Sequence, residues 1–126
     1  MTETEQPGTG WFLDLCGPLT LDPDGEGTAS APYLPPAGLP AGAEPALALE
    51  ALHQIACRLA AAVREVDRCV PARLLEYRPA DPGTARTGNG VLRARVLRSG
   101  RLSVVETSLA AGSAVSHATV CSQELR

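Results

Sequence analysis

The sequence predicts an α+β domain in which one long helix packs against an antiparallel sheet. Two observations support this class. Only residues 45–66 are apolar over a length that suits a substantial helix, and short segments separated by tight turns follow them. A chain of 126 residues with 44% hydrophobic residues suffices for one domain with a real core. We expect residues 1–10 to form a disordered tail and residues 11–126 to form the single domain.

The helical segment reads PALALEALHQIACRLAAAVREV. Pro45 suits its first position, where the missing N–H costs nothing. The spacing predicts one apolar stripe, made of Leu52, Ile55, Ala56, Leu59, Ala62, Val63 and Val66. Glu50, Gln54, Cys57 and Ala61 are expected on the opposite side. Val70-Pro71 is expected to end this element.

Strands are expected on both sides of the helix. Residues 11–22 contain a short apolar strand that Pro18 makes an edge or broken strand. A turn over residues 22–25 leads to a returning strand at 27–34, and the prolines and glycines of 35–45 predict a loop. The four strands predicted after the helix, several joined by hairpin turns, are residues 72–78, 90–98, 101–109 and 114–123.

Charge and cysteine content argue against several functions. The net charge is −3, with eight acids and no arginine in residues 1–57, and all eleven arginines in residues 58–126. We therefore expect no nucleic-acid partner. Four cysteines without metal-ligand spacing, and only two histidines, predict no metal site and no cofactor. An acidic N-terminus without signal-peptide features, and no apolar stretch of membrane-spanning length, predict a cytoplasmic protein without a membrane partner.

Three stretches resemble the hotdog superfamily, in which a long helix is wrapped by a curved antiparallel sheet. Residues 49–54, LEALHQ, are similar to the LEAxxQ helix segment of hotdog β-hydroxyacyl carrier-protein dehydratases. Residues 78–83, RPADPG, resemble their RPxxPG turn, and residues 96–120 resemble the closing hairpins of these dehydratases and of small hotdog acyl-CoA thioesterases. The resemblance covers residues 12–124 and implies a hotdog fold.

The sequence departs from these families just before the helix. Hotdog dehydratases carry a catalytic histidine there, but this chain has no histidine before His53, and residues 35–38 read PPAG. Thioesterases of the fold often carry HGG at this point. Here residues 41–43 read AGA, so a glycine is retained and the histidine is absent.

The resemblance implies acyl thioesters of coenzyme A or acyl carrier protein as substrates. Glu50 would activate water or attack the thioester, and the backbone amides of Gly42 and Ala43 would stabilise the oxyanion. The candidates for contacting the substrate are Gln54, His53, Tyr33, Tyr77, Arg98 and Arg101, the two arginines through the phosphates. Several of these have a plainer interpretation: Glu50 and the arginines as solvated charges, Gln54 as a structural or dimer contact, and Tyr77 as a core residue.

Three functional hypotheses follow. The first is a thioesterase that uses Glu50 with the Gly42 and Ala43 amides. The second is a dehydratase or isomerase on a β-hydroxyacyl or polyketide thioester, which needs His53 or His117 to replace the absent loop histidine. The third is a non-catalytic acyl-binding or complex-forming subunit. The fold also implies a homodimer or a dimer of dimers, with the acyl site between subunits and with edge strands pairing.

Overall fold

The computed structural model describes residues 13–23, 25, 27–38, 40–81 and 89–125. The proposed tail at residues 1–10 and the Pro82-Gly83 part of the RPxxPG stretch lie outside these residues. A single α-helix, α1 (Glu44–Arg64, 21 residues), follows a short 3₁₀ turn, η1 (Ala41–Ala43). The strands are β1 (Thr20–Leu21), β2 (Thr28–Tyr33), β3 (Cys69–Arg78), β4 (Gly90–Arg98), β5 (Leu102–Ala111) and β6 (Ala114–Glu124).

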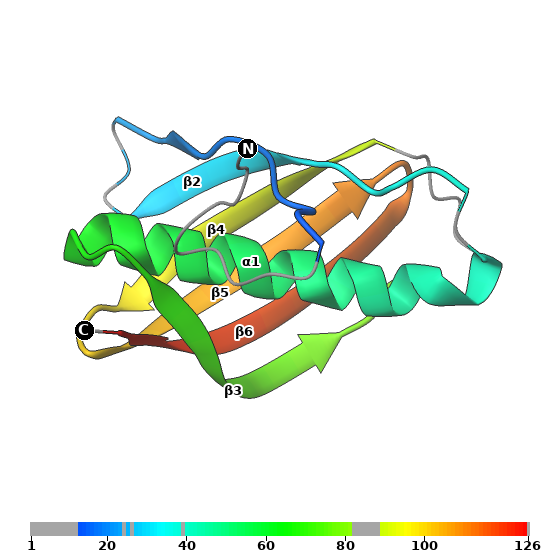
Figure 1. Cartoon of the computed structure of the whole chain (residues 1–126). Helices are drawn as coiled ribbons and strands as arrows, with labels where there is room; N and C mark the ends of the chain where they lie inside the picture. Colours follow the sequence, from blue (N-terminus) through cyan, green and yellow to red (C-terminus); the bar gives the residue numbers. More distant parts are fainter. Residues whose placement is uncertain (1–12, 24, 26, 39, 82–88, 126) are drawn as a thin grey trace, which may run out of the picture.

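The six strands form one antiparallel sheet in the order β1-β2-β4-β5-β6-β3, and α1 lies along one face of it (Figure 1). The helix is inserted between β2 and β3, so the chain crosses from one side of the sheet to the other before β4, β5 and β6 fill the centre. This confirms the α+β class and is consistent with a hotdog-like architecture. All four strands predicted after the helix are present, with β3 beginning three residues earlier than expected.

The N-terminal segment runs antiparallel to β2 and is broken at Pro18. On one side of the break, Cys16 forms an isolated bridge with Tyr33, and the N–H of Gly17 donates to the carbonyl of Pro32 at 2.8 Å. On the other side, β1 pairs with β2. A Cβ on Gly17 would lie 2.5 Å from the Pro32 side chain, so the close approach of these backbones requires glycine. The predicted broken edge strand is confirmed.

Helix α1 begins one residue before the predicted start and ends two residues before the predicted end. Pro45 is its second residue, where its missing N–H is still without cost. At the other end Glu65 adopts a left-handed conformation with φ 57°, and the N–H groups of Glu65 and Val66 return to the carbonyls of Ala62 and Ala61. Val70 and Pro71 do not end the helix: they lie in β3, where an edge strand with a bulge after Pro71 tolerates proline.

The middle of α1 is buried on nearly all sides, which differs from the single stripe expected. Leu52, Ile55 and Leu59 are fully buried as predicted, but so are Gln54 and Cys57, which we expected on the opposite side. The reason is that two structures cover the helix: the sheet, and residues 13–17. We expected no apolar stretch of membrane-spanning length, but α1 is long and apolar enough to be one. Half of that window is buried within the fold, as in a core helix.

Alternation along the strands separates a helix-facing side of the sheet from an outer side. In β4, Leu92 and Ala94 are buried beneath α1, whereas Arg93 and Arg95 are exposed on the outer side. The β5–β6 hairpin turns through Gly112 and Ser113, and the positive φ of Gly112 (64°) is the conformation that a tight hairpin turn requires at this position.

Candidate functional site

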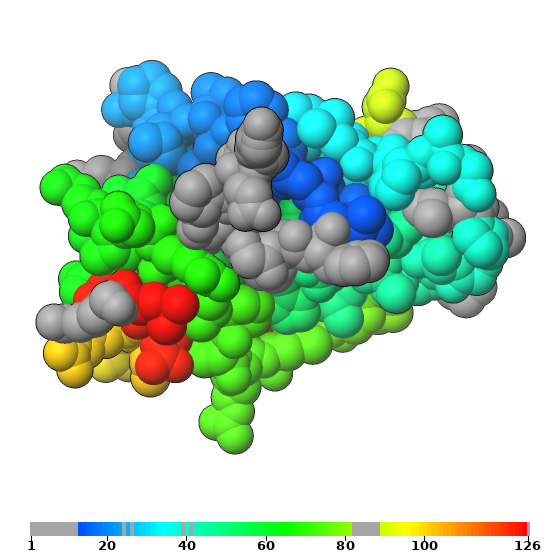
Figure 2. Space-filling model, in the orientation of Figure 1, coloured from blue at the N-terminus to red at the C-terminus, as the bar shows by residue number. Residues whose placement is uncertain are grey.

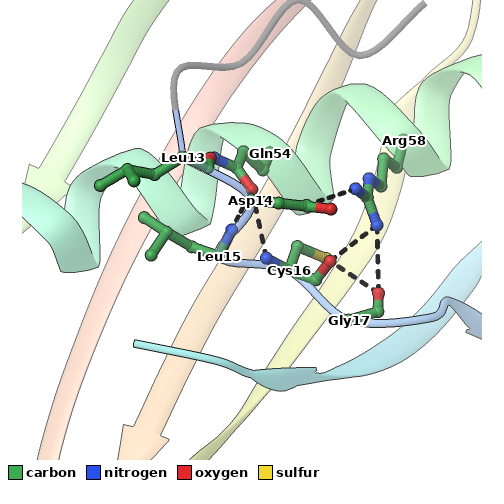
Figure 3. Close-up of polar contacts among 7 residues, drawn as sticks. All are labelled: Leu13, Asp14, Leu15, Cys16, Gly17, Gln54 and Arg58. Atoms are coloured by element: carbon green, nitrogen blue, oxygen red, sulfur yellow. Dashed lines mark hydrogen bonds and ion pairs between the residues drawn. The ribbon is translucent and has the colours of Figure 1, made fainter. Parts of the chain in front are cut away.

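The amide side chain of Gln54 joins the middle of α1 to the N-terminal segment. Its oxygen accepts the backbone N–H groups of Leu15 (2.9 Å) and Cys16 (3.1 Å), and its nitrogen donates to the carbonyl of Leu13 at 2.6 Å (Figure 3). The fully buried Gln54 therefore uses both ends of its amide on backbone groups. In this chain Gln54 holds two segments together, which is the structural role we had considered for it.

Arg58, one turn further along α1, extends this connection. Its guanidinium donates to the carbonyls of Cys16 (2.7 Å) and Gly17 (3.2 Å) and pairs with the Asp14 carboxylate at 2.7 Å. Figure 2 shows the N-terminal segment (dark blue) lying across the middle of the molecule over the helix. Gln54 and Arg58 thus close the side of α1 that the sheet leaves open.

Glu50 lies on the face of α1 between this segment and β6. Seven residues separate it from Cys57, which is two helical turns, so the two side chains share one direction. The Cys57 thiol lies 3.4 Å from the hydroxyl of Ser122 on β6, so this face of the helix is directed towards β6. Glu50 is half-buried. It therefore sits at the boundary of the core, at the N-terminal end of the helix.

His53 lies one turn from Glu50, at a spacing that makes the two side chains neighbours on the helix surface. It is half-buried, and its Nδ1 lies 3.0 Å from the carbonyl oxygen of Leu49. A carbonyl only accepts hydrogen bonds, so Nδ1 carries the proton in this contact, and in the neutral ring Nε2 is left as an acceptor.

Gly42 and Ala43 form the 3₁₀ turn that leads into α1. The N–H of Ala43 already donates to the carbonyl of Pro40 at 3.0 Å. Ala43 is also seven residues before Glu50, which corresponds to about 10 Å along the helix axis. Within one chain, Glu50 and these amides are therefore too far apart to contact the same substrate carbonyl group.

The two tyrosines lie on the helix-facing side of the sheet. Tyr33 on β2 is fully buried in the core. Tyr77 on β3 is half-buried, packs against the core and is paired with Ala118 of β6. Because β3 ends near the N-terminal half of α1 (Figure 1), Tyr77 lies at the same end of the molecule as Glu50.

Arg98 and Arg101 lie at the other end. The carbonyl of Arg101 accepts the N–H of Glu124, whose carboxylate pairs with Arg64 at 2.9 Å. Arg64 is the last residue of α1, about 21 Å along the axis from Glu50. Both arginines are exposed. Within one chain they are remote from the carboxylate they were expected to assist.

Ser116, which was not among the expected site residues, lies on the helix-facing side of β6. Its side chain is 1% exposed, and its hydroxyl has no hydrogen-bond partner among the described residues. Ser116 comes six residues before Ser122, towards the N-terminal end of α1 (Figure 1). A buried hydroxyl without a partner is costly and so marks this end of the core as a place where a polar group of a ligand would be stabilised. A single serine in an alternating strand matches no motif, so the sequence alone could not identify Ser116 as a site residue.

The four cysteines are free thiols, and the three buried ones lack the character of nucleophiles. Burial raises the pKa of Cys57 to about 12 and that of Cys16 to about 11, and it also raises the pKa of Cys69. Among residues 13–23, 25, 27–38, 40–81 and 89–125, no group of three or more His, Cys, Asp or Glu side chains is placed to hold a metal ion. No family model, no curated protein and no solved structure matches this chain.

Proposed function

We propose that this chain is a hotdog-fold thioesterase that hydrolyses an acyl thioester of coenzyme A or of an acyl carrier protein. The observation that carries the proposal is the half-buried Glu50 in the N-terminal half of a helix packed on an antiparallel sheet. Two further features support it: Ser116, a buried hydroxyl without a described partner, and Tyr77, both at the same end.

In this reaction Glu50 accepts a proton from water, and the resulting hydroxide attacks the thioester carbonyl carbon. The carbonyl electrons move to oxygen; when they return to re-form the carbonyl, the C–S bond breaks and the thiolate takes the proton from Glu50. The products are a carboxylic acid and a free thiol. Hydrogen-bond donors aimed at the oxyanion would supply the second part of the rate enhancement.

The proposal requires a second copy of the chain. A carbonyl group must lie about 3 Å from both the base and the oxyanion donors, whereas Glu50 and the Gly42–Ala43 amides of one chain are about 10 Å apart along the helix axis. A dimer in which one subunit supplies Glu50 and the other supplies donors removes this conflict. The exposed edge of β3, with Leu74 (40% exposed) and Leu75 (49% exposed), supports such pairing.

Thiol release from short, long and aromatic acyl thioesters tests this function. We expect Glu50→Gln to slow hydrolysis by about 100-fold or more, because a general base contributes at least that factor. Glu65→Gln, which removes an exposed carboxylate at the far end of the helix, serves as the matched control. Equal rates for the parent and Glu50→Gln on every substrate would refute the role of Glu50.

A dehydratase or isomerase is the second candidate, and His53 is the observation that favours it. With Nδ1 donating to Leu49, Nε2 is an acceptor one turn from Glu50, so the two groups could divide the base and acid roles. The assay is hydration of an enoyl thioester, monitored as loss of its absorbance. A loss of absorbance without release of free thiol distinguishes this reaction from hydrolysis.

A non-catalytic acyl-binding subunit is the third candidate. It is favoured by the Ala43 amide, which is already bonded to Pro40, and by the absence of a histidine before the helix. It predicts binding of acyl thioesters without turnover in either assay.

A further inference from the structure

The outer side of the sheet, away from α1, carries a hollow of about 720 Å³. It extends from the β1–β2 hairpin, at Thr20 and Asp22, to Arg78 at the end of β3. Its volume lies in the range of small-molecule sites, and hydroxyls, guanidinium groups, an imidazole and the carboxylates of Asp22 and Glu106 line it. Because Glu50 belongs to the helix packed on the other side, this hollow is separate from the proposed thioester site.

One row of side chains crosses the floor of this hollow. Ser30 of β2 is paired with Arg93 of β4, Arg93 with Ser108 of β5, Ser108 with His117 of β6, and His117 with Arg78 of β3. We call these five residues the donor row. Paired residues in register point to the same side of a sheet. Neighbouring strands lie about 4.8 Å apart, and β4 and β3 are three strands apart, so about 14 Å separates the backbones of Arg93 and Arg78. Two arginine side chains can therefore converge on Ser108 and His117 between them.

The donor row contains no carboxylate, whereas the next row along the strands does. There, Arg95 pairs with Glu106 at 3.1 Å. Arg93 makes no ion pair with any described residue. Arg78 contacts Glu76 at 3.7 Å, but both side chains are more than half exposed, and an exposed pair at this distance contributes little. The donor row itself thus carries positive charge that is compensated only weakly, and the two carboxylates that line the hollow, Asp22 and Glu106, lie outside the row.

We propose that the donor row binds the phosphate group of a phosphorylated small molecule. Guanidinium groups match phosphate oxygens in a two-pronged geometry, and serine hydroxyls donate the additional hydrogen bonds that a phosphate accepts. The hollow around the row has room for the rest of the molecule. Arg93 provides the main charge at the centre of the sheet, Arg78 closes the site from the β3 edge, and Ser108 lies between them.

The test is an NMR titration of the intact chain with pyrophosphate at constant ionic strength, with sodium chloride as the matched salt. We expect saturable shifts of the amides of Ser108 and His117, and affinity at least tenfold weaker in Arg93→Gln. Arg73→Gln is the control, because it removes the same charge from an exposed position of β3 about 15 Å along the strand from Arg78. This variant should bind as the parent does.

Three outcomes would overturn the proposal. The first is the absence of saturable shifts at millimolar pyrophosphate. The second is equal weakening by Arg93→Gln and Arg73→Gln, which would indicate general attraction by net charge alone. The third is a change of oligomeric state on Arg93→Gln in sedimentation, which would indicate that a second copy covers this side. None of these outcomes depends on thioester turnover, so they are distinguishable from failure of the proposed function.

Discussion

The side-chain oxygen of Gln54 accepts the backbone N–H of Leu15 at 2.9 Å, which joins the middle of α1 to a segment 39 residues earlier in the chain. The same side chain also accepts the backbone N–H of Cys16 and donates to the carbonyl of Leu13. One buried amide therefore replaces the strand partner that these backbone groups would otherwise need. This contact fixes the helix against the β2 side of the sheet and leaves Glu50 on the side nearer β6.

Gln54→Leu should lower the free energy of unfolding by roughly 3 kcal/mol. The substitution keeps the volume but leaves two backbone N–H groups and one carbonyl without their partner, and each such loss in a buried site costs about 1–3 kcal/mol. Urea unfolding measures the change. Gln123→Leu, on an exposed position of β6, is the control and should cost less than about 0.5 kcal/mol. Equal losses in the two variants would contradict the bridging role.

The stability of the protein should decline above pH 9 because of Cys57. Its ordinary pKa is 9.0, and burial raises it to about 12 in the folded chain. Below pH 9 both states hold the proton. Between pH 9 and 12 the unfolded state releases it and the folded state retains it, so unfolding becomes easier as pH rises, by up to about 1.4 kcal/mol per pH unit.

Thermal unfolding of Cys57→Ser between pH 8 and 11 measures this contribution. The serine keeps a hydrogen-bonding group near Ser122 but does not ionise in this range, so its stability should fall less steeply than that of the parent. Cys121→Ser, at the half-exposed thiol, should follow the parent curve. If both variants change with pH as the parent does, the raised pKa of Cys57 has no effect on folding.

Glu65 should be replaceable by glycine with a gain in stability. Its φ of 57° is a left-handed conformation that costs a residue with a side chain about 1–2 kcal/mol, and it ends α1 as glycine commonly does. We expect Glu65→Gly to be about 1 kcal/mol more stable than Glu65→Ala, which loses the carboxylate but keeps the strain. Chemical denaturation of the two variants decides this, and a glycine variant no more stable than the alanine variant would be contrary evidence.

Much of the fold could be predicted from the sequence because periodicity reports local structure. Residues 45–66 and the alternation in residues 90–98 gave a helix and a strand within two residues of their true bounds. The burial of Gln54 and Cys57 could not be predicted in this way. Gln54 is buried because residues 13–17 fold over the helix, and Cys57 because β6 places Ser122 against it; both are contacts between distant parts of the chain that no local pattern encodes.

The candidate site was less predictable than the fold. The sequence identified Glu50 and His53 as neighbours, since three residues always bring helical side chains together. It could not reveal that the Ala43 amide is occupied by Pro40, because that bond depends on the 3₁₀ turn. Nor could it show that Arg98 and Arg101 lie at the far end of α1, since that depends on the order of strands in the sheet.

The edge of β3 should be the surface through which two copies of the chain associate. β3 is the last strand of the sheet, and most of its side chains are exposed, including Leu75 at 49%. An unpaired edge with exposed leucines favours pairing with another strand. If the proposed thioester site needs donors from a second copy, dissociation of the dimer should also remove hydrolysis.

Leu75→Arg is therefore expected to weaken self-association at least tenfold in sedimentation equilibrium, because a charge replaces an apolar contact at the edge. Leu97→Arg is a closely matched control: Leu97 is 50% exposed on β4, in the interior of the sheet, away from this edge. It should leave the association constant unchanged. A parent chain that is monomeric at micromolar concentration, or an equal effect of the two substitutions, would rule out β3 as the interface and would also remove the second copy that the proposed site requires.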